Sequence, residues 1–248
     1  MAIILVSGCG LLLGKLADLF LPATYRDARV EGPLIRCSDC QRRATLFDAV
    51  PLAETALRGR CPQCGSPIPI RWLLLPVATA VLGAICYLEF GSVGEALVGT
   101  LFAGILLTLV FTDLERRVLP DRIVLPSIIA AAGLAWSLPG NTLIGSGYGA
   151  IVALIVAAIM VIGSLPFGRS AFGMGDAKLI LLLGVLLGPR DVLVAVLLAF
   201  VAAGVVAGAL LISRQRDRGS YLPLGPFLAI GGIAAMLWGG EIWDWWVE

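Results

Sequence analysis

The sequence contains no histidine, and only 14% of its 248 residues are charged. A chain without histidine cannot build a Ser-His-Asp triad, an H-E-x-x-H zinc protease site or a histidine proton relay. Any acid–base chemistry must therefore use Asp, Glu, Lys, Tyr or Cys. The net charge is only +1, so the chain also lacks the broad basic surface that gathers nucleic acid. We expect no nucleic-acid partner.

The shortage of charge accompanies an excess of apolar residues, which make up 59% of the chain and give a mean hydropathy of +0.96. An average soluble domain carries about 25% charged residues. The apolar residues come in long runs, and about 20 in a row are enough to cross a bilayer as a helix. Barrel strands would instead alternate polar and apolar residues. We predict an all-α membrane protein of about eight transmembrane helices, with lipid as its main solvent.

The eight predicted spans are residues 2–21, 73–90, 94–112, 122–138, 143–166, 177–188, 191–213 and 224–240. The sixth is short for a bilayer, so it is extended at its ends, matched by a thinner membrane, or incomplete. A cleavable signal peptide is the alternative for the first, but no basic segment precedes it, as such signals require. The chain thus divides into a first helix at 1–21, a soluble insert at 22–72 and a seven-helix membrane domain at 73–248.

Lysine and arginine are distributed unevenly between the segments that join these spans. Of the 18 basic residues, 16 lie in the insert or in the loops around 113–122, 167–178 and 214–218. Short cytoplasmic loops retain positive charge. The distribution predicts that the insert and these three loops are cytoplasmic, and that both termini lie on the opposite side.

Four cysteines of the insert form two C-x-x-C pairs, Cys37 with Cys40 and Cys61 with Cys64. This spacing is typical of a tetrahedral zinc site made of four thiolates. Disulfides or redox pairs are the alternative, which a reducing cytoplasm disfavours. Four thiolates leave no open position for a water molecule, so the predicted zinc is structural and stabilises a small insert that has little core.

Two aspartates lie at the ends of predicted spans, because Asp113 closes the third and Asp176 opens the sixth. An acid at the membrane is costly and is therefore a candidate functional group. With the predicted topology both lie on the cytoplasmic side and can meet. Two close carboxylates do not both ionise easily, so one can accept a proton from an attacking water while the other donates to the developing oxyanion. The pair predicts aspartic peptidase chemistry.

The residues around Asp176 fit that chemistry. Gly173 and Gly175 have no Cβ, so we expect them to let the loop turn sharply and let a peptide approach the acid. Lys178 either biases the charge of Asp176 or anchors the helix on the positive side. The alternative for both aspartates is that they cap helices or face water, as helix-end aspartates commonly do. By the same rule we expect Asp121 to cap the next helix.

Together these features resemble the type IV prepilin peptidase family of bacteria. The resemblance rests on the two cysteine pairs and, in chain order, on Leu57–Cys61, Asp113 with Leu119–Asp121, Gly173–Lys178, and Pro223–Phe227. It implies that Asp113 and Asp176 are the catalytic pair and that they act on the cytoplasmic side of the inner membrane. The implied substrate is a prepilin or pseudopilin, cut between a glycine and the hydrophobic helix that follows it.

Many members of that family also methylate the new amino terminus with S-adenosylmethionine, and here the resemblance is thinner. Gly14–Asp18 stands where the family usually has a Gly-Ser-Phe-Leu-Asn stretch. Arg71–Pro76 stands where an Arg-Tyr-Pro stretch usually leads to a Glu. The peptidase residues are unaffected by these differences, whereas methyl transfer stays open.

Three other functions compete with this interpretation. A presenilin-like intramembrane protease also uses a Gly-x-Gly-Asp motif, but the four-cysteine insert and Leu119-Pro120-Asp121 favour the prepilin group. A transporter could use buried aspartates to carry ions or protons. A membrane scaffold held by a zinc module would leave both aspartate motifs without a role.

Overall fold

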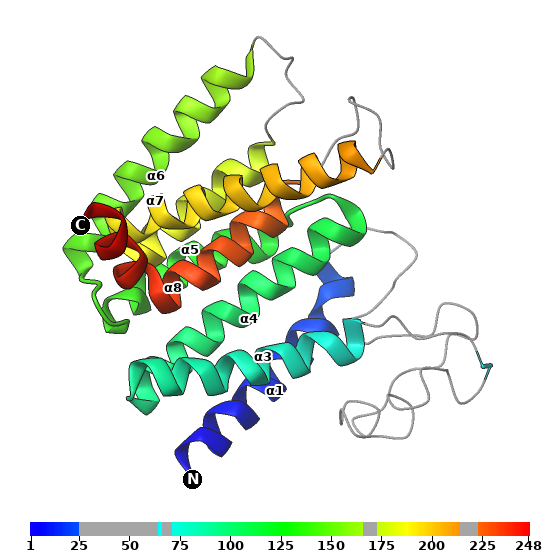
Figure 1. Cartoon of the computed structure of the whole chain (residues 1–248). Helices are drawn as coiled ribbons and strands as arrows, with labels where there is room; N and C mark the ends of the chain where they lie inside the picture. Colours follow the sequence, from blue (N-terminus) through cyan, green and yellow to red (C-terminus); the bar gives the residue numbers. More distant parts are fainter. Residues whose placement is uncertain (25–63, 66–70, 166–172, 214–222) are drawn as a thin grey trace. The chain divides into compact units, whose positions relative to one another are not determined.

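The computed structural model describes residues 1–24, 64–65, 71–165, 173–213 and 223–248 (Figure 1). Within these ranges every regular element is a helix. The chain forms two compact units, Met1–Thr108 and Leu109–Glu248, whose boundary falls inside one helix. The predicted zinc insert lies mostly outside the described residues, and so do three of its cysteines, Cys37, Cys40 and Cys61.

The helices follow the predicted apolar segments closely. In chain order they are α1 (Ala2–Thr24), α3 (Arg71–Phe90), α4 (Val93–Arg116), α5 (Asp121–Leu134), the short 3₁₀ helix η1 (Ala135–Ser137), α6 (Leu143–Ser164), α7 (Met174–Ile212) and α8 (Gly225–Val247). The fourth predicted span, 122–138, is shorter than expected, because α5 ends at Leu134 and a 3₁₀ turn follows.

Five helices of the described residues, α3, α4, α6, α7 and α8, are long and apolar enough to cross a membrane. Large apolar side chains are exposed on their surfaces and elsewhere, as at Ile129 (75%) and Ile144 (73%). Exposure of so many large apolar side chains is unusual for a protein surrounded by water. The all-α membrane fold is therefore supported, with five candidate spans, while crossing by α1, by α5 and by each half of α7 stays a prediction.

Helix α7 contains both the sixth and the seventh predicted span without a loop between them. Gly188 interrupts the helix with a φ of 85°, and Pro189, which has no backbone N–H, follows it. The side-chain amide of Asn141 donates a hydrogen bond of 2.9 Å to the carbonyl of Leu186 beside this break. Backbone groups released by a break in an apolar helix need such a partner. The short sixth span is thus a half-helix that begins earlier than predicted, at Met174.

The first unit contains α1 and α3 packed together, with the first part of α4 against them. Their approach is close, because a Cβ on Gly14 would lie 2.7 Å from the Cα of Pro76. Asp18 of α1 is fully buried and forms an ion pair of 3.3 Å with Arg71 of α3. Lys15 is also buried. Two helices of this unit are therefore joined by charge as well as by apolar packing.

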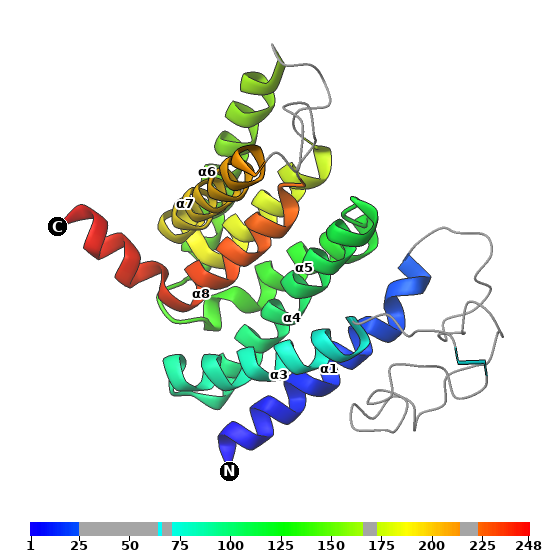
Figure 2. The ribbon, with the colours of Figure 1, turned by 45° about the vertical axis from the view of Figure 1, so that its right-hand side comes forward.

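The second unit is built around the first half of α7. Its core is formed by fully buried side chains of that half-helix, Leu179, Ile180, Leu182, Leu183 and Leu186. Helices α5, α6 and α8 pack against α7, and both views show α6, α7 and α8 side by side (Figures 1 and 2). Gly149 of α6 lies against the backbone of Gly184, which allows the close approach that small residues give in membranes.

Helix α8 is longer than the predicted span 224–240 and bends at Trp238, whose φ is −131° and ψ is 15°. The segment after this residue turns away from the axis of the rest of α8 (Figure 2). The straight part before the bend packs against α7 through Gly231 and Gly232. This packing fixes the start of α8, which reaches the candidate site.

Candidate active site

Asp113 lies in the last turn of α4 and is only 6% exposed. The helix ends three residues later, at Arg116. Arg117 then adopts a left-handed backbone with a φ of 54°, and its N–H donates to the carbonyl of Asp113 at 2.8 Å. This is the usual arrangement at a helix C-terminus, although glycine is the common residue there. The chain therefore turns away directly after presenting Asp113.

The start of α8 holds the side chain of Asp113. The carboxylate accepts a hydrogen bond from the backbone N–H of Gly225, the first residue of that helix. A Cβ on Gly225 would lie 2.5 Å from Oδ2 of Asp113 and 3.0 Å from its Cγ. The first N–H groups of a helix have no partner inside it and carry a partial positive charge, so they favour a carboxylate. Only a glycine leaves space for the acid here.

Asp176 is the third residue of α7 and is also only 6% exposed. Its backbone N–H donates to the carbonyl of Gly173 at 3.1 Å, and its carboxylate accepts from the N–H of Gly173. This reciprocal pair resembles a capping box, in which the third helical residue reaches back to the residue before the helix. Asp176 therefore caps its own helix, and the same contact fixes the direction of its carboxylate.

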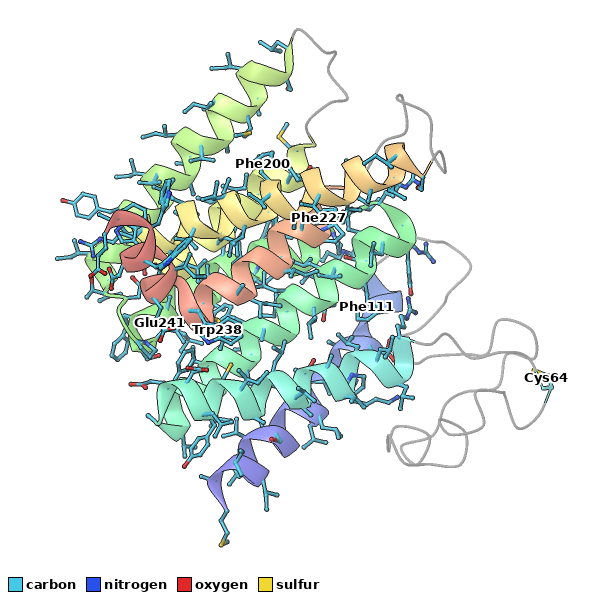
Figure 3. The ribbon with its side chains drawn as sticks, in the orientation of Figure 1. Cys64, Phe111, Phe200, Phe227, Trp238 and Glu241 are labelled. Atoms are coloured by element: carbon cyan, nitrogen blue, oxygen red, sulfur yellow. The ribbon has the colours of Figure 1, made fainter. Side chains whose placement is uncertain are left out.

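The carboxylates of Asp113 and Asp176 interact electrostatically. They belong to the same unit and are brought together where the C-terminal end of α4 meets the N-terminal ends of α7 and α8. Figure 3 labels Phe111 and Phe227, which mark the end of α4 and the start of α8. Two buried carboxylates that feel each other's charge do not both ionise easily, so they can share one proton. Such a pair can supply a general base and a general acid at once.

Gly173 and Gly175 lie at this site, directly before α7 and in its first turn. Neither adopts a positive φ, so their own backbone does not require glycine, and the loop expected to turn sharply lies mostly outside the described residues. What the two positions need is space. A Cβ on Gly173 would lie 3.2 Å from Oδ2 of Asp176, and one on Gly175 would lie 3.2 Å from Cβ and Cδ1 of Leu119.

Lys178 contacts Asp121, with 2.6 Å between Nζ and Oδ1. The expected capping role of Asp121 is therefore wrong, because α5 begins at Asp121 itself and the preceding Pro120 makes no side-chain cap. Local capping rules favour an aspartate directly before a helix, but here the carboxylate of Asp121 forms an ion pair with Lys178 of α7. The pair joins the start of α5 to the start of α7.

Sequence reasoning missed the role of Gly225. The segment Pro223–Phe227 was one of those that carried the family resemblance, yet nothing in its residues indicates a partner. The contact with Asp113 arises only when α4 and α8 meet. The tight approach of Leu119 to Gly175 was missed for the same reason.

Of the four predicted zinc ligands, only Cys64 is described, and its side chain is exposed (Figure 3). In the described ranges, no group of three or more Cys, Asp or Glu side chains gathers as a metal site would require.

Comparison with known proteins adds two family matches. Residues 100–208 match the model described as the type IV leader peptidase family, and residues 9–90 match the one described as the bacterial peptidase A24 N-terminal domain. The first match contains both aspartates. No solved structure matches the chain.

Several relatives named prepilin leader peptidase/N-methyltransferase are similar over most of this chain. The one from Pseudomonas putida is 34% identical over 218 residues, which cover 85% of this chain and 74% of that protein. The one from Legionella pneumophila is 30% identical over 243 residues, covering 93% and 77%. The one from Burkholderia pseudomallei strain K96243 is 35% identical over 230 residues, covering 90% and 72%. With its apolar helices, this chain is a multi-pass membrane protein that belongs to the type IV leader peptidase family.

Proposed function

We propose that this protein is an aspartic endopeptidase that removes the leader peptide of a type IV prepilin or pseudopilin. The observation that carries the proposal is the meeting of two buried carboxylates, those of Asp113 and Asp176, at the ends of three helices. The names of the relatives, which join leader cleavage to N-methylation, support the substrate class.

The proposed reaction needs only a water molecule and this pair. One carboxylate, as its anion, takes a proton from the water while the water oxygen attacks the scissile carbonyl. The partner, in its protonated form, donates to the carbonyl oxygen as charge develops there. When the C–N bond breaks, a proton passes to the leaving nitrogen, so the products are a leader carboxylate and a new amino terminus. The Gly225 N–H and the Gly173 N–H hold the two acids in place during these transfers.

We place the reaction at the cytoplasmic face of a bacterial inner membrane, with about eight membrane crossings. Basic residues adjoin both aspartates in the chain, with Arg116 and Arg117 just after Asp113, and Lys178 just after Asp176. Segments rich in lysine and arginine remain in the cytoplasm. The membrane lipid and the substrate helix are then partners of the apolar helix surfaces, while the polar site faces the cytoplasm.

We also propose that the protein methylates the amino terminus that cleavage exposes, with S-adenosylmethionine as the methyl source. The support is the name shared by its relatives, and the described residues assign no group to this step. When bound, that cofactor would supply an electrophilic methyl group. The chain's own part would be to hold the new amine uncharged beside it.

One experiment tests both activities. The purified protein, reconstituted in vesicles, is incubated with a prepilin and methyl-radiolabelled S-adenosylmethionine. We expect mass spectrometry to show a single cut between a glycine and the hydrophobic helix, and the label to appear on the shortened product only. An uncut prepilin would contradict the proposed peptidase, whereas a shortened but unlabelled product would restrict the function to cleavage.

We propose that the insert binds one structural zinc ion through Cys37, Cys40, Cys61 and Cys64. Four thiolates are a donor set that fits zinc, and their spacing as two C-x-x-C pairs is typical of a tetrahedral zinc site. Metal analysis of the purified protein is expected to give about one zinc per chain. Changing Cys37 or Cys64 to Ser should remove the metal and lower the melting temperature. The matched variants Cys9→Ser and Cys86→Ser, in α1 and α3, should keep it, and zinc retained by a Cys61→Ser/Cys64→Ser double variant would contradict the site.

A further inference from the structure

Two separate contacts join the segment that follows Asp113 to the first turns of α7. The first is the ion pair of Lys178 with Asp121, whose Nζ and Oδ1 lie 2.6 Å apart although the residues are 57 positions apart in the chain. The second is the approach of Leu119 to Gly175, where an added Cβ would lie 3.2 Å from the leucine side chain. In each contact, one residue belongs to the segment after Asp113 and the other to the first turns of α7.

Both contacts lie next to the acids but involve neither of them. Lys178 follows Asp176 by two positions, and residues so spaced on a helix point to different sides. Its ammonium group therefore pairs with Asp121, while the carboxylate of Asp176 accepts the hydrogen bond of Gly173 and interacts electrostatically with Asp113. The chain from Asp113 to Asp121 is thus tied at its far end to the turn that carries Asp176.

Stability alone is a poor explanation of this ion pair. Its side chains are 32% and 56% exposed, and exposed pairs contribute little to folding because water screens them. The geometry of the pair is nevertheless that of a short, charge-assisted hydrogen bond, which fixes direction well. A contact that orients two helix ends without adding much stability fits a positioning role.

We propose that Lys178 and Asp121 are positioning residues, whose ion pair, together with the Leu119 to Gly175 contact, sets the separation of Asp113 and Asp176. This inference rests on the proposed peptidase function. The pair acts through the backbone of the two segments and contacts neither the attacking water molecule nor the substrate. Its loss leaves both acids in the site but lets the distance between them vary.

The test uses the full-length protein in vesicles, with prepilin cleavage measured as kcat and KM separately. We expect Lys178→Gln and Asp121→Asn each to lower kcat by about 10-fold, since small misplacements of reacting groups cost this much or more. KM and the melting temperature should change little. In a double-mutant cycle, Lys178→Gln with Asp121→Asn should cost no more than either change alone, because one interaction is lost only once.

Charge reversal separates positioning from simple loss of charge. Lys178→Asp or Asp121→Lys alone should lower kcat further than the neutral variants, while the two together should recover most of the wild-type kcat. Arg122→Gln, which removes a charge from the position next to Asp121, is the matched control and should keep the wild-type kcat. If the reversed single variants fold poorly, the conservative Lys178→Arg, which keeps the charge, should still cleave near the wild-type rate.

The outcomes distinguish this inference from the function on which it rests. A wild-type protein that does not cleave prepilin would overturn both. A wild-type protein that cleaves, with Lys178→Gln and Asp121→Asn equally fast, would overturn the positioning role alone. Additive losses in the double-mutant cycle, or no recovery on charge reversal, would also overturn it, because two independent residues would then explain the data.

Discussion

Changing Asp113 or Asp176 to Asn should lower the rate of leader removal by about 100-fold or more, because each variant removes a proton-transfer group from the pair. Asparagine has nearly the same shape as aspartate, and its carbonyl oxygen can still accept the hydrogen bond that Gly225 or Gly173 donates. Both variants should therefore fold and still bind the prepilin. Cleavage by the purified proteins in vesicles, followed over time, measures the effect.

The chain offers a matched control for these variants. Asp191 is a further aspartate of α7, partly buried and packed against Gly239 at the other side of the Gly188 break. Asp191→Asn should cleave at nearly the wild-type rate, because this acid lies outside the site. The double variant Asp113→Asn/Asp176→Asn should cleave about as slowly as either single variant, because the two acids act as a unit that is already lost when one of them is changed. If either Asp113→Asn or Asp176→Asn cleaved at the wild-type rate, the proposed catalytic pair would be wrong. The aspartates would then be assigned to helix capping or to transport.

The fold could be predicted where it depends on residues near in sequence. Apolar length and composition located the described helices approximately, and Gly188 and Pro189 stand where the predicted spans 177–188 and 191–213 adjoin. The pair could not show that the segments would continue as one interrupted helix. That outcome depends on Asn141, a residue of another loop, whose amide compensates the carbonyl of Leu186.

The candidate site, like the fold, could be predicted only where it depends on residues near in sequence. Asp113 and Asp176 were predicted from charge at the ends of apolar runs, and their electrostatic interaction agrees with the expected meeting. Asp121 shows the limit of local rules, because its position before a helix predicted a cap while the structure pairs it with Lys178. The carboxylate of Asp121 pairs with Lys178, which is distant in sequence, and does not cap the backbone N–H groups of α5. No local sequence pattern identifies Lys178 as its partner.

Gly225 offers the most direct way to move one acid without removing it. In Gly225→Ala the new Cβ would start 2.5 Å from Oδ2 of Asp113, so the carboxylate must shift away. The obstacle is the end of a flexible side chain, so the helices can keep their packing and the protein should fold. We expect kcat to fall by about 10- to 100-fold, as for other displaced catalytic groups, with a small change in KM.

A graded series of glycine variants makes this prediction specific. Gly173→Ala, whose Cβ would lie 3.2 Å from Oδ2 of Asp176, should have a smaller effect, because a few tenths of an ångström relieve the contact. Gly204→Ala in α7 meets nothing within 4 Å and should cleave like the wild type. Rates measured on equal amounts of folded protein should follow that order. If Gly225→Ala matched Gly204→Ala, the carboxylate of Asp113 would not need the place that the start of α8 gives it, and the proposed geometry of the pair would be wrong.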